Sequence, residues 1–208
     1  LFRSNEAHVL ESSVESVRRY LTESGFPHGW RIVIVNNGST DATGDVAASL
    51  SARHPDVVCH QLQRRGRGLA LRHAWIHSSA DAVCYMDVDL STELTHIQPL
   101  IGAILDQGFD VAIGSRLLPG SRTGRSLKRE FISRAYNLIV RSAFHTRIRD
   151  AQCGFKAASR SAVERVLPRV VDDGWFFDTE LLILAEAEGD RKSVVLGKSV
   201  DIRGRRFI

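Results

Sequence analysis

Short apolar runs alternate with helical patterns along the first half of this chain, and this alternation restricts the fold more than any other feature. Leu10, Val14, Val17 and Leu21 recur at helical spacing, while residues 31–35 form a short β-branched run that stops at a polar cluster. Alternation of strands with helices is typical of a parallel sheet covered by helices. We expect strands over residues 31–35, 57–62, 82–86 and 110–114, and helices over residues 6–24, 41–53, 68–79 and 96–107.

The pattern changes after Ser115, where we expect a loop and then helices over residues 128–144, 159–167 and 177–188. No linker rich in Gly, Pro or Ser and no internal repeat divides the chain, so we expect one α/β domain. Its 208 residues are enough to bury a core. No run approaches 18 consecutive apolar residues, so we expect no membrane-spanning helix. The three Cys form no C-x-x-C pair, which predicts a reduced, cytoplasmic compartment.

The two ends of the chain differ from the rest. Residues 190–208 hold six basic side chains against two acidic ones, so the formal net charge of +4 belongs to this tail and predicts no nucleic-acid partner for the domain. Residues 190–195 are what the codons GAT CGG AAG AGC GTC GTG encode, which resembles a sequencing adapter, and residues 1–4 match the end of the partner adapter. The competing interpretation is a natural basic tail. We expect the domain to span residues 5–189 and the segments 1–4 and 190–208 to be artefactual and outside the fold.

The first polar cluster follows the strand predicted at 31–35. Residues 36–41 read Asn-Asn-Gly-Ser-Thr-Asp, and Asp41 is placed to cap the next helix. Gly38 allows a sharp turn, while the backbone amides and the Asn and Asp side chains can hold a nucleoside. Because any strand-to-helix turn favours these residue types, the cluster alone does not identify a site.

The second cluster is a pair of carboxylates at the end of the strand predicted at 82–86. Asp87 and Asp89 stand one residue apart, at the edge of an open sheet where α/β proteins bind ligands. Two anions there repel each other, and burial penalises both, so a cation resolves the conflict. Oxygen ligands in an open site suit Mg²⁺ or Mn²⁺ bridging a diphosphate. The alternative is a helix cap beside a solvated Asp.

These motifs, taken in order, resemble family 2 glycosyltransferases of the GT-A fold. The resemblance extends over residues 5–189. Two later runs, 149–156 (Arg-Asp-Ala-Gln-Cys-Gly-Phe-Lys) and 175–181 (Trp-Phe-Phe-Asp-Thr-Glu-Leu), are similar to the dolichyl-phosphate and polyprenyl-phosphate glucosyl- and mannosyltransferases. The earlier motifs are Asn5-Glu6, the run 36–41, Gly66-Arg67-Gly68, Asp87-Val88-Asp89 and Gly114-Ser115-Arg116.

The resemblance implies a role for each matching residue. Asp89 would ligate the metal, with Ser91 as a second ligand where some members have Gln, and Arg116 would neutralise the donor phosphate. Asp150, Asp178 and Glu180 would line the sugar and acceptor pocket. The nucleotide sugar would contact Glu6, Val35, Asn37, Asp41, Asp87 and Val88.

The sequence departs from the family at two places. The family usually has Asp-Asp where this chain has Asn36-Asn37, which weakens one polar contact and bears on the preference for the base. Residues 1–4 stand where the family has its first strand, so we expect that strand to be missing.

The resemblance implies an inverting transfer of a hexose from a nucleotide sugar, of the UDP-glucose or GDP-mannose type, to a polyprenyl or dolichyl phosphate. A phosphate acceptor is already anionic and needs little general-base help, so Asp150 would orient the acceptor. Transfer to a sugar hydroxyl is the alternative, and it would require Asp178 or Glu180 as a base. A sugar nucleotidyltransferase is a second alternative, but this chain lacks the Gly-rich, Lys-containing signature that such enzymes usually carry near the N-terminus. A third alternative is a non-catalytic fragment that binds a nucleotide.

The segment 116–149 is rich in basic residues, and we expect it to face the acceptor. Residues 116–149 carry nine basic side chains and one acidic one, interleaved with apolar residues. A core helix with solvated Arg residues is one interpretation. The other, favoured by the resemblance, is a membrane surface and a lipid phosphate at Lys128, Arg129 and Arg134. We therefore expect a peripheral protein at the inner face of a prokaryotic cell membrane.

Overall fold

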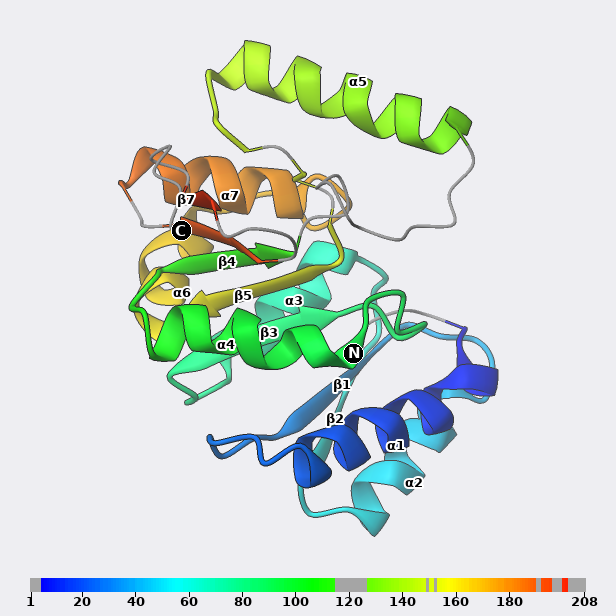
Figure 1. Cartoon of the computed structure of the whole chain (residues 1–208). Helices are drawn as coiled ribbons and strands as arrows, with labels where there is room; N and C mark the ends of the chain where they lie inside the picture. The colour runs from blue at the N-terminus through cyan, green and yellow to red at the C-terminus, as the bar shows by residue number, and fades with distance from the viewer. Residues whose placement is uncertain are drawn as a thin grey trace.

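The structure is a computed structural model that describes residues 5–114, 127–148, 150–151, 153–189, 192–195 and 200–201; the side chains of 127–134, 192–195 and 200–201 lie outside this description. It has an α/β architecture with helices on both sides of the strands (Figure 1), which confirms the predicted fold class. Among the described residues, no helix is both long enough and apolar enough to cross a membrane.

The elements of the first half match the expected alternation closely. The helix α1 buries Leu10, Val14, Val17 and Leu21 along one face, as their spacing predicts. The strand β1 runs two residues further than expected, through the first two residues of the polar cluster. The elements are α1 (Ala7–Glu23), β1 (Ile32–Asn37), α2 (Thr43–Arg53), β2 (Val57–Leu62), α3 (Arg67–Ile76) and β3 (Ala82–Met86).

The second half contains a strand that the sequence analysis missed. Residues 155–159 form β5, which was expected to be loop; this run lacks the Val and Ile residues that identify strands. The elements are η1 (Leu94–His96), α4 (Ile97–Leu105), β4 (Val111–Gly114), α5 (Leu127–Phe144), β5 (Phe155–Ser159), α6 (Arg160–Val166), η2 (Leu167–Arg169), α7 (Phe177–Ala187), β6 (Lys192–Val195) and β7 (Val200–Asp201).

The strands form two sheets. β1 pairs with β2 in parallel, and the other strands follow the order β3-β5-β4-β6-β7. β5 is antiparallel to both β3 and β4, so β3 and β4 point the same way and Phe155 lies opposite Met86. The chain between Gly114 and Phe155 therefore leaves and re-enters the sheet at one edge, the edge where β3 ends. Residues 1–4, where the family's first strand was expected to be missing, lie outside the described residues.

Residues after Gly189 correct one expectation. We expected the segment 190–208 to lie outside the fold, but Lys192–Val195 pairs in parallel with β4 and is followed by β7. The run Ser-Val-Val has the β-branched character of a strand, and the edge of β4 offers unpaired backbone groups. The expectation about placement is therefore wrong for these residues, while the adapter origin stays a prediction.

Apolar helices enclose the sheets and fix the strand ends that carry the polar clusters. α4 packs against β3, β5 and β4, and it buries Ile97, Leu100, Ile101 and Ile104. α3 packs against β1 on one side and against α6 and α7 on the other, so its N-terminus lies between the two clusters and the start of α7. The rigid framework thus presents the polar ends of β1 and β3 near α3 and α7.

Candidate active site

The turn after β1 joins two motifs that lie more than 30 residues apart. Gly38 adopts φ +61°, a left-handed conformation that favours glycine. Asn5 lies against this turn: its side-chain oxygen accepts the Thr40 N–H at 3.0 Å, and its own N–H donates to the Ser39 hydroxyl at 3.2 Å. The N–H of Glu6 donates to the Thr43 hydroxyl at 2.9 Å. The expected grouping of Asn5-Glu6 with the run 36–41 is therefore present.

The polar residues of this turn mainly hold each other. α2 begins at Thr43, two residues later than expected, and the Asp41 carboxylate accepts the Thr43 N–H at 3.1 Å. A hydrogen bond from the Thr43 hydroxyl is the largest reason that the pKa of Asp41 is lowered. Asn37 is buried and its side-chain oxygen accepts the Gly66 N–H at 3.0 Å, which ties the first cluster to the Gly-Arg-Gly turn.

Two of the residues expected to contact the nucleotide have side chains in the core. Val35 is 4% exposed and Val88 is 1% exposed. Only their backbone atoms can therefore face a ligand. Apolar side chains at these positions set the strand ends rather than the chemistry of the site.

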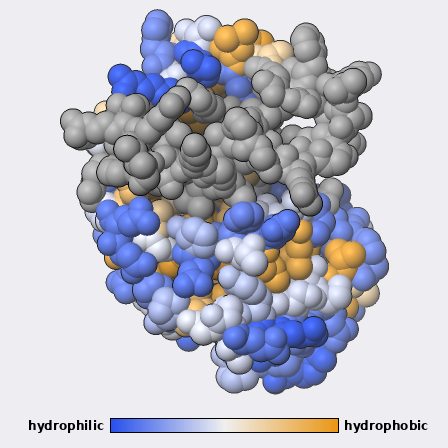
Figure 2. All heavy atoms as spheres, viewed as in Figure 1, coloured by the Kyte–Doolittle hydropathy of each residue, from blue (hydrophilic) through white to orange (hydrophobic). Residues whose placement is uncertain are grey.

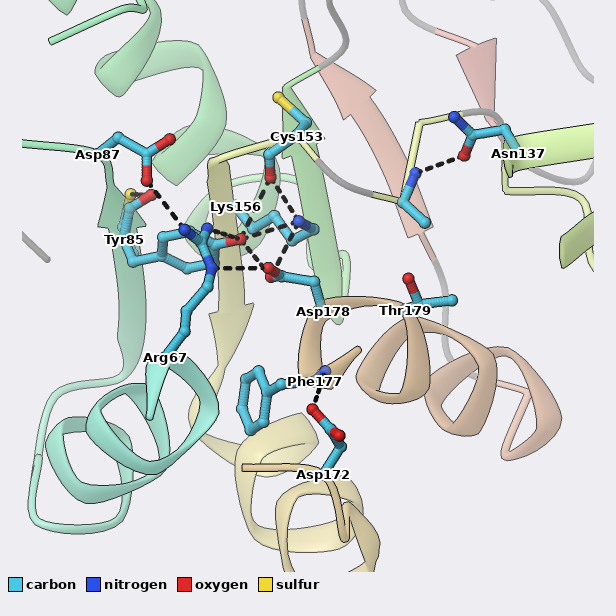
Figure 3. A network of polar contacts seen from close by, with 12 residues as sticks. Arg67, Tyr85, Asp87, Asn137, Cys153, Lys156, Asp172, Phe177, Asp178 and Thr179 are labelled. Carbon is cyan, nitrogen blue, oxygen red and sulfur yellow. Dashed lines mark hydrogen bonds and ion pairs between the residues drawn. The ribbon is translucent and has the colours of Figure 1, made fainter. Parts of the chain in front are cut away.

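The carboxylates after β3 differ in their surroundings. Asp87 is half-buried, whereas Asp89 is exposed and accepts the Ser91 N–H at 3.1 Å. Leu90, between Asp89 and Ser91, has φ +47°, a backbone conformation that is strained for a branched side chain. This turn brings Ser91 beside Asp89 on the outer side, while Asp87 points inward (Figure 3).

Arg67 connects Asp87 to the start of α7. Its Nη1 lies 3.2 Å from Asp87 Oδ1, and its Nε lies 3.0 Å from Asp178 Oδ2. Its Nη2 donates to the Tyr85 hydroxyl at 3.3 Å, and the exposed ring of Trp175 lies over the guanidinium, 5.3 Å away. The side chain of Arg67 is only 9% exposed. Every guanidinium nitrogen therefore has a protein partner.

Lys156 provides a second buried cation in the same network. Its Nζ lies 3.0 Å from Asp178 Oδ1 and 2.9 Å from the Tyr85 hydroxyl, and the residue is 0% exposed. The Tyr85 hydroxyl in turn donates to Asp178. Figure 3 shows these groups meeting from β3, β5, α3 and α7. Two carboxylates and two cations make the network electrically balanced.

The network shifts the pKa values of Asp178, Tyr85 and Arg67. Burial would raise the pKa of Asp178, but Lys156 and Arg67 outweigh burial and hold it below its ordinary value. Burial and the Asp178 charge raise the pKa of Tyr85 well above its usual range. Burial opposes the charge of Arg67, yet the neighbouring Tyr85, Asp178 and Asp87 raise its pKa. Asp178 therefore stays ionised and is a poor proton acceptor.

The other two carboxylates that the resemblance implies for the sugar and acceptor pocket are also engaged or buried. Glu180 accepts the N–H groups of Val171 at 3.1 Å and Asp172 at 2.8 Å, which fixes the segment that precedes α7. Asp150 is 4% exposed and lies beside Ala151, whose N–H donates to Asn137 of α5 at 3.0 Å.

Several predicted positions are not described. Arg116 lies outside the described residues, and Lys128, Arg129 and Arg134 lie in the part of α5 whose side chains are not described. Conversely, the sequence analysis assigned no role to Arg67, Tyr85 or Lys156. The Gly-Arg-Gly turn and a Lys within an otherwise apolar strand were the available signals.

The residues after β3 offer a partial set of metal ligands. Among the described residues, no group of three His, Cys, Asp or Glu side chains is placed to hold a metal ion. The exposed carboxylate of Asp89, close to the backbone of Ser91, would suit a hard cation that would take its remaining oxygens from a substrate diphosphate and water.

The sequence of this chain is similar to a protein family and to several known relatives. The family described as Glycosyl transferase family 2 matches residues 4–167. Glycosyltransferase AglD of Haloferax volcanii is 36% identical over 192 residues, which span 90% of this chain and 30% of that protein. The dolichyl-phosphate beta-glucosyltransferase of Saccharomyces cerevisiae is 31% identical over 175 residues, 75% of this chain and 52% of that protein. The chain thus spans at most about half the length of either relative.

Solved structures show the same fold. Glucosyl-3-phosphoglycerate synthase from Mycobacterium tuberculosis, in complex with Mn²⁺, UDP and phosphoglyceric acid, superposes with a TM-score of 0.69 at 19% identity, covering 99% of this chain and 69% of that one. Mannosyltransferase PcManGT from Pyrobaculum calidifontis, in complex with GDP-Man and Mn²⁺, gives 0.54 at 20% identity, covering 86% and 49%.

Proposed function

This chain belongs to glycosyl transferase family 2, and from that membership we propose that it transfers a hexose, with inversion at the anomeric carbon, from a nucleotide sugar to a polyprenyl or dolichyl phosphate. The similarity to AglD and to a dolichyl-phosphate glucosyltransferase supports this acceptor class. A donor of the UDP-glucose or GDP-mannose type agrees with the nucleotides in the similar solved structures.

The state of the acceptor-side carboxylates supports a phosphate acceptor most strongly. Transfer to a sugar hydroxyl needs a general base. Asp178 is held by two cations with a lowered pKa, and Glu180 is occupied by backbone N–H groups. A phosphate oxygen is already a nucleophile and needs neither group. Asp150 would then orient the acceptor.

Donor binding would use the edge of the sheet where β1 and β3 end. We assign Glu6, Asn37 and Asp41 to the base and ribose side, with the backbone of Val35 and Val88 completing the floor. Asp87 would lie along the nucleotide. Its orientation is set before the donor arrives, because Arg67 already holds its carboxylate at 3.2 Å.

We assign Asp89 and Ser91 to a Mg²⁺ or Mn²⁺ ion. Such an ion, when bound, would neutralise the charge that develops on the departing diphosphate. Each nitrogen of the Arg67 guanidinium already has a protein partner, and Asp87 and Asp178 balance its charge, so we do not assign this residue to the diphosphate. Arg116, which follows β4, is the protein cation that we assign to the donor phosphate.

The acceptor would approach from α5 and the adjoining chain. Leu138 and Ile139 are 61% and 67% exposed on the outer face of α5, with the exposed Arg141 nearby. Figure 2 shows an apolar area at the top of the molecule, where Figure 1 places α5, with hydrophilic side chains beside it. Apolar residues flanked by bases suit the surface of an anionic membrane, with Lys128, Arg129 and Arg134 toward the lipid phosphate.

We place the protein at the inner face of a prokaryotic cell membrane. Among the described residues, the three cysteines form no disulfide with one another, which agrees with a reducing compartment.

Transfer of radiolabel tests the proposal. The purified chain is incubated with Mn²⁺, a polyprenyl or dolichyl phosphate and either UDP-[¹⁴C]glucose or GDP-[¹⁴C]mannose, and lipid is extracted with organic solvent. We expect label in the lipid phase only when the phosphate is present. Label that enters a water-soluble saccharide instead, with none in lipid, would refute the proposal and favour a hydroxyl acceptor.

A further inference from the structure

We propose that Arg67 and Lys156 are positioning residues that jointly hold the carboxylate of Asp87 in its binding orientation, with Asp178 as their shared anchor. The proposal rests on the proposed function, in which Asp87 lies along the nucleotide. It assigns to Asp178 the role of an electrostatic anchor in place of a direct contact with sugar or acceptor. The four side chains come from α3, β5, α7 and the turn after β3 (Figure 3).

The planar guanidinium of Arg67 transmits position from one carboxylate to the other. Its Nε is 3.0 Å from Asp178 and its Nη1 is 3.2 Å from Asp87. Because the guanidinium is rigid, fixing Nε on one carboxylate fixes the direction in which Nη1 points. The Tyr85 hydroxyl at 3.3 Å from Nη2 prevents rotation about the remaining axis. A lysine ammonium in place of Arg67 could contact both acids but could not fix this angle.

The charge of Lys156 allows Arg67 to pair with both Asp178 and Asp87. With Lys156 present, Asp178 has two cations, so Arg67 can also neutralise Asp87. Without Lys156, two carboxylates compete for one guanidinium. The side chain of Asp178 is 4% exposed and that of Asp87 is 23% exposed, so an unneutralised charge costs more at Asp178. Arg67 would then stay with Asp178, and Asp87 would be released.

The backbone of Gly154 also limits the movement of the Asp87 carboxylate, on the side away from Arg67. A Cβ atom placed on Gly154 would lie 1.9 Å from Asp87 Oδ2, so the backbone of residue 154 lies directly against this carboxylate. Arg67 on one side and the Gly154 backbone on the other leave Asp87 little room. Release of Arg67 therefore lets the carboxylate turn away from the position that the donor would meet.

Removing one charge from the network and then restoring its balance distinguishes positioning from a merely structural role. The variant Lys156→Met leaves two acids and one base, and the double variant Lys156→Met/Asp178→Asn restores one acid and one base. We expect Lys156→Met to weaken binding of the donor diphosphate about tenfold, and the double variant to recover most of that loss. The probes are UDP and GDP, each with Mn²⁺, titrated by calorimetry. A structural role predicts no recovery, because the double variant has lost more native contacts.

Arg72→Met is the matched control. Arg72 lies on the same helix, stacks on Phe177 and pairs with Asp173 at 3.5 Å, and within the described part of the chain no hydrogen bond or ion pair joins it to Asp87. We expect its nucleotide affinity to match that of the parent chain. Equal affinities for Lys156→Met and Arg72→Met would overturn the proposal, as would a double variant no better than Lys156→Met.

Crystal structures of the parent chain and the variants without nucleotide test the positioning role independently of the proposed function. If the parent chain binds neither UDP nor GDP, the donor assignment fails, and the variants are then judged by the Arg67–Asp87 contact alone. We expect the 3.2 Å contact to open beyond ~4 Å in Lys156→Met and to close again in the double variant. A contact that stays closed in Lys156→Met would overturn the positioning role.

Discussion

Replacing Gly154 by Ala should displace a site carboxylate with a single methyl group. The added Cβ would lie 1.9 Å from Asp87 Oδ2 and 2.6 Å from its Cγ. Ordinary contacts between such atoms are about 3.5 Å, so the carboxylate must move by roughly 1.5 Å. That movement breaks the contact between Asp87 and Arg67, which is 3.2 Å long.

The cost can be estimated from what moves. The neighbour that must yield is a short side chain held by an ion pair, and the change adds one methyl group to a packed region. Overpacking of this kind typically costs about 1–3 kcal/mol. We expect the free energy of unfolding of Gly154→Ala to fall by about 2 kcal/mol and its affinity for UDP or GDP with Mn²⁺ to fall at least tenfold, because Asp87 leaves its position.

Urea unfolding at pH 7, followed by tryptophan fluorescence, measures the first effect, and calorimetry measures the second. Gly29→Ala is the control, because nothing lies within 4 Å of a Cβ at that position. Its free energy of unfolding should change by less than about 1 kcal/mol. If Gly154→Ala matched Gly29→Ala in both stability and affinity, the close approach of residue 154 to Asp87 would be refuted.

Four other outcomes are expected. Asp89→Ala should abolish Mn²⁺-dependent transfer while the urea midpoint changes little, since Asp89 is exposed; retained transfer would exclude it as the ligand. The lowered pKa of Asp178 predicts that its contribution to stability is complete above about pH 4 and is lost as the pH falls through its folded pKa. Asp178→Asn should flatten that acid limb of urea unfolding. Replacing Arg129 and Arg134 by Ala should raise the KM for polyprenyl phosphate more than the KM for the nucleotide sugar, and should weaken binding to anionic vesicles; equal effects on both KM values would count against the acceptor assignment. Sequencing the source gene should show a different continuation in place of residues 190–208, and unchanged codons there would disprove the adapter origin.

The strands β1 to β4 could be predicted because each carries a β-branched or apolar run that ends at a polar residue. β5 could not, because its sequence Phe-Lys-Ala-Ala-Ser has neither alternation nor branched residues. Its place in the sheet comes from pairing with β3 and β4 on both sides, which is tertiary information. A lysine at position 156 in a buried strand runs against hydrophobic patterning, and its contacts with the Asp178 carboxylate and the Tyr85 hydroxyl explain it.

The candidate site also has features that could be predicted from the sequence and features that could not. The carboxylates after β3 could be placed from sequence, because strand ends of an α/β sheet meet at one edge. The contacts of the buried network could not, since the ion pair Arg67–Asp178 joins residues 111 positions apart and the hydrogen bond Lys156–Tyr85 joins residues 71 positions apart. No local pattern encodes which cation meets which acid. Sequence reasoning also assigned Asp178 to the pocket, whereas its contacts in the structure are with buried protein groups.

The reversed direction of β5 makes the acceptor side of this fold exchangeable. Because β3 and β4 run together and β5 runs back between them, Gly114 and Phe155 lie at one edge, and the chain between them is a single excursion from the sheet. The strand pairs and the contacts that hold the turn after β1 use residues outside that excursion. Grafting residues 117–152 of a relative with another acceptor, which keeps Arg116 and Gly154 in place, should therefore change what receives the sugar while preserving the nucleotide preference. Divergence within such a lineage can proceed by rewriting one contiguous stretch of coding sequence.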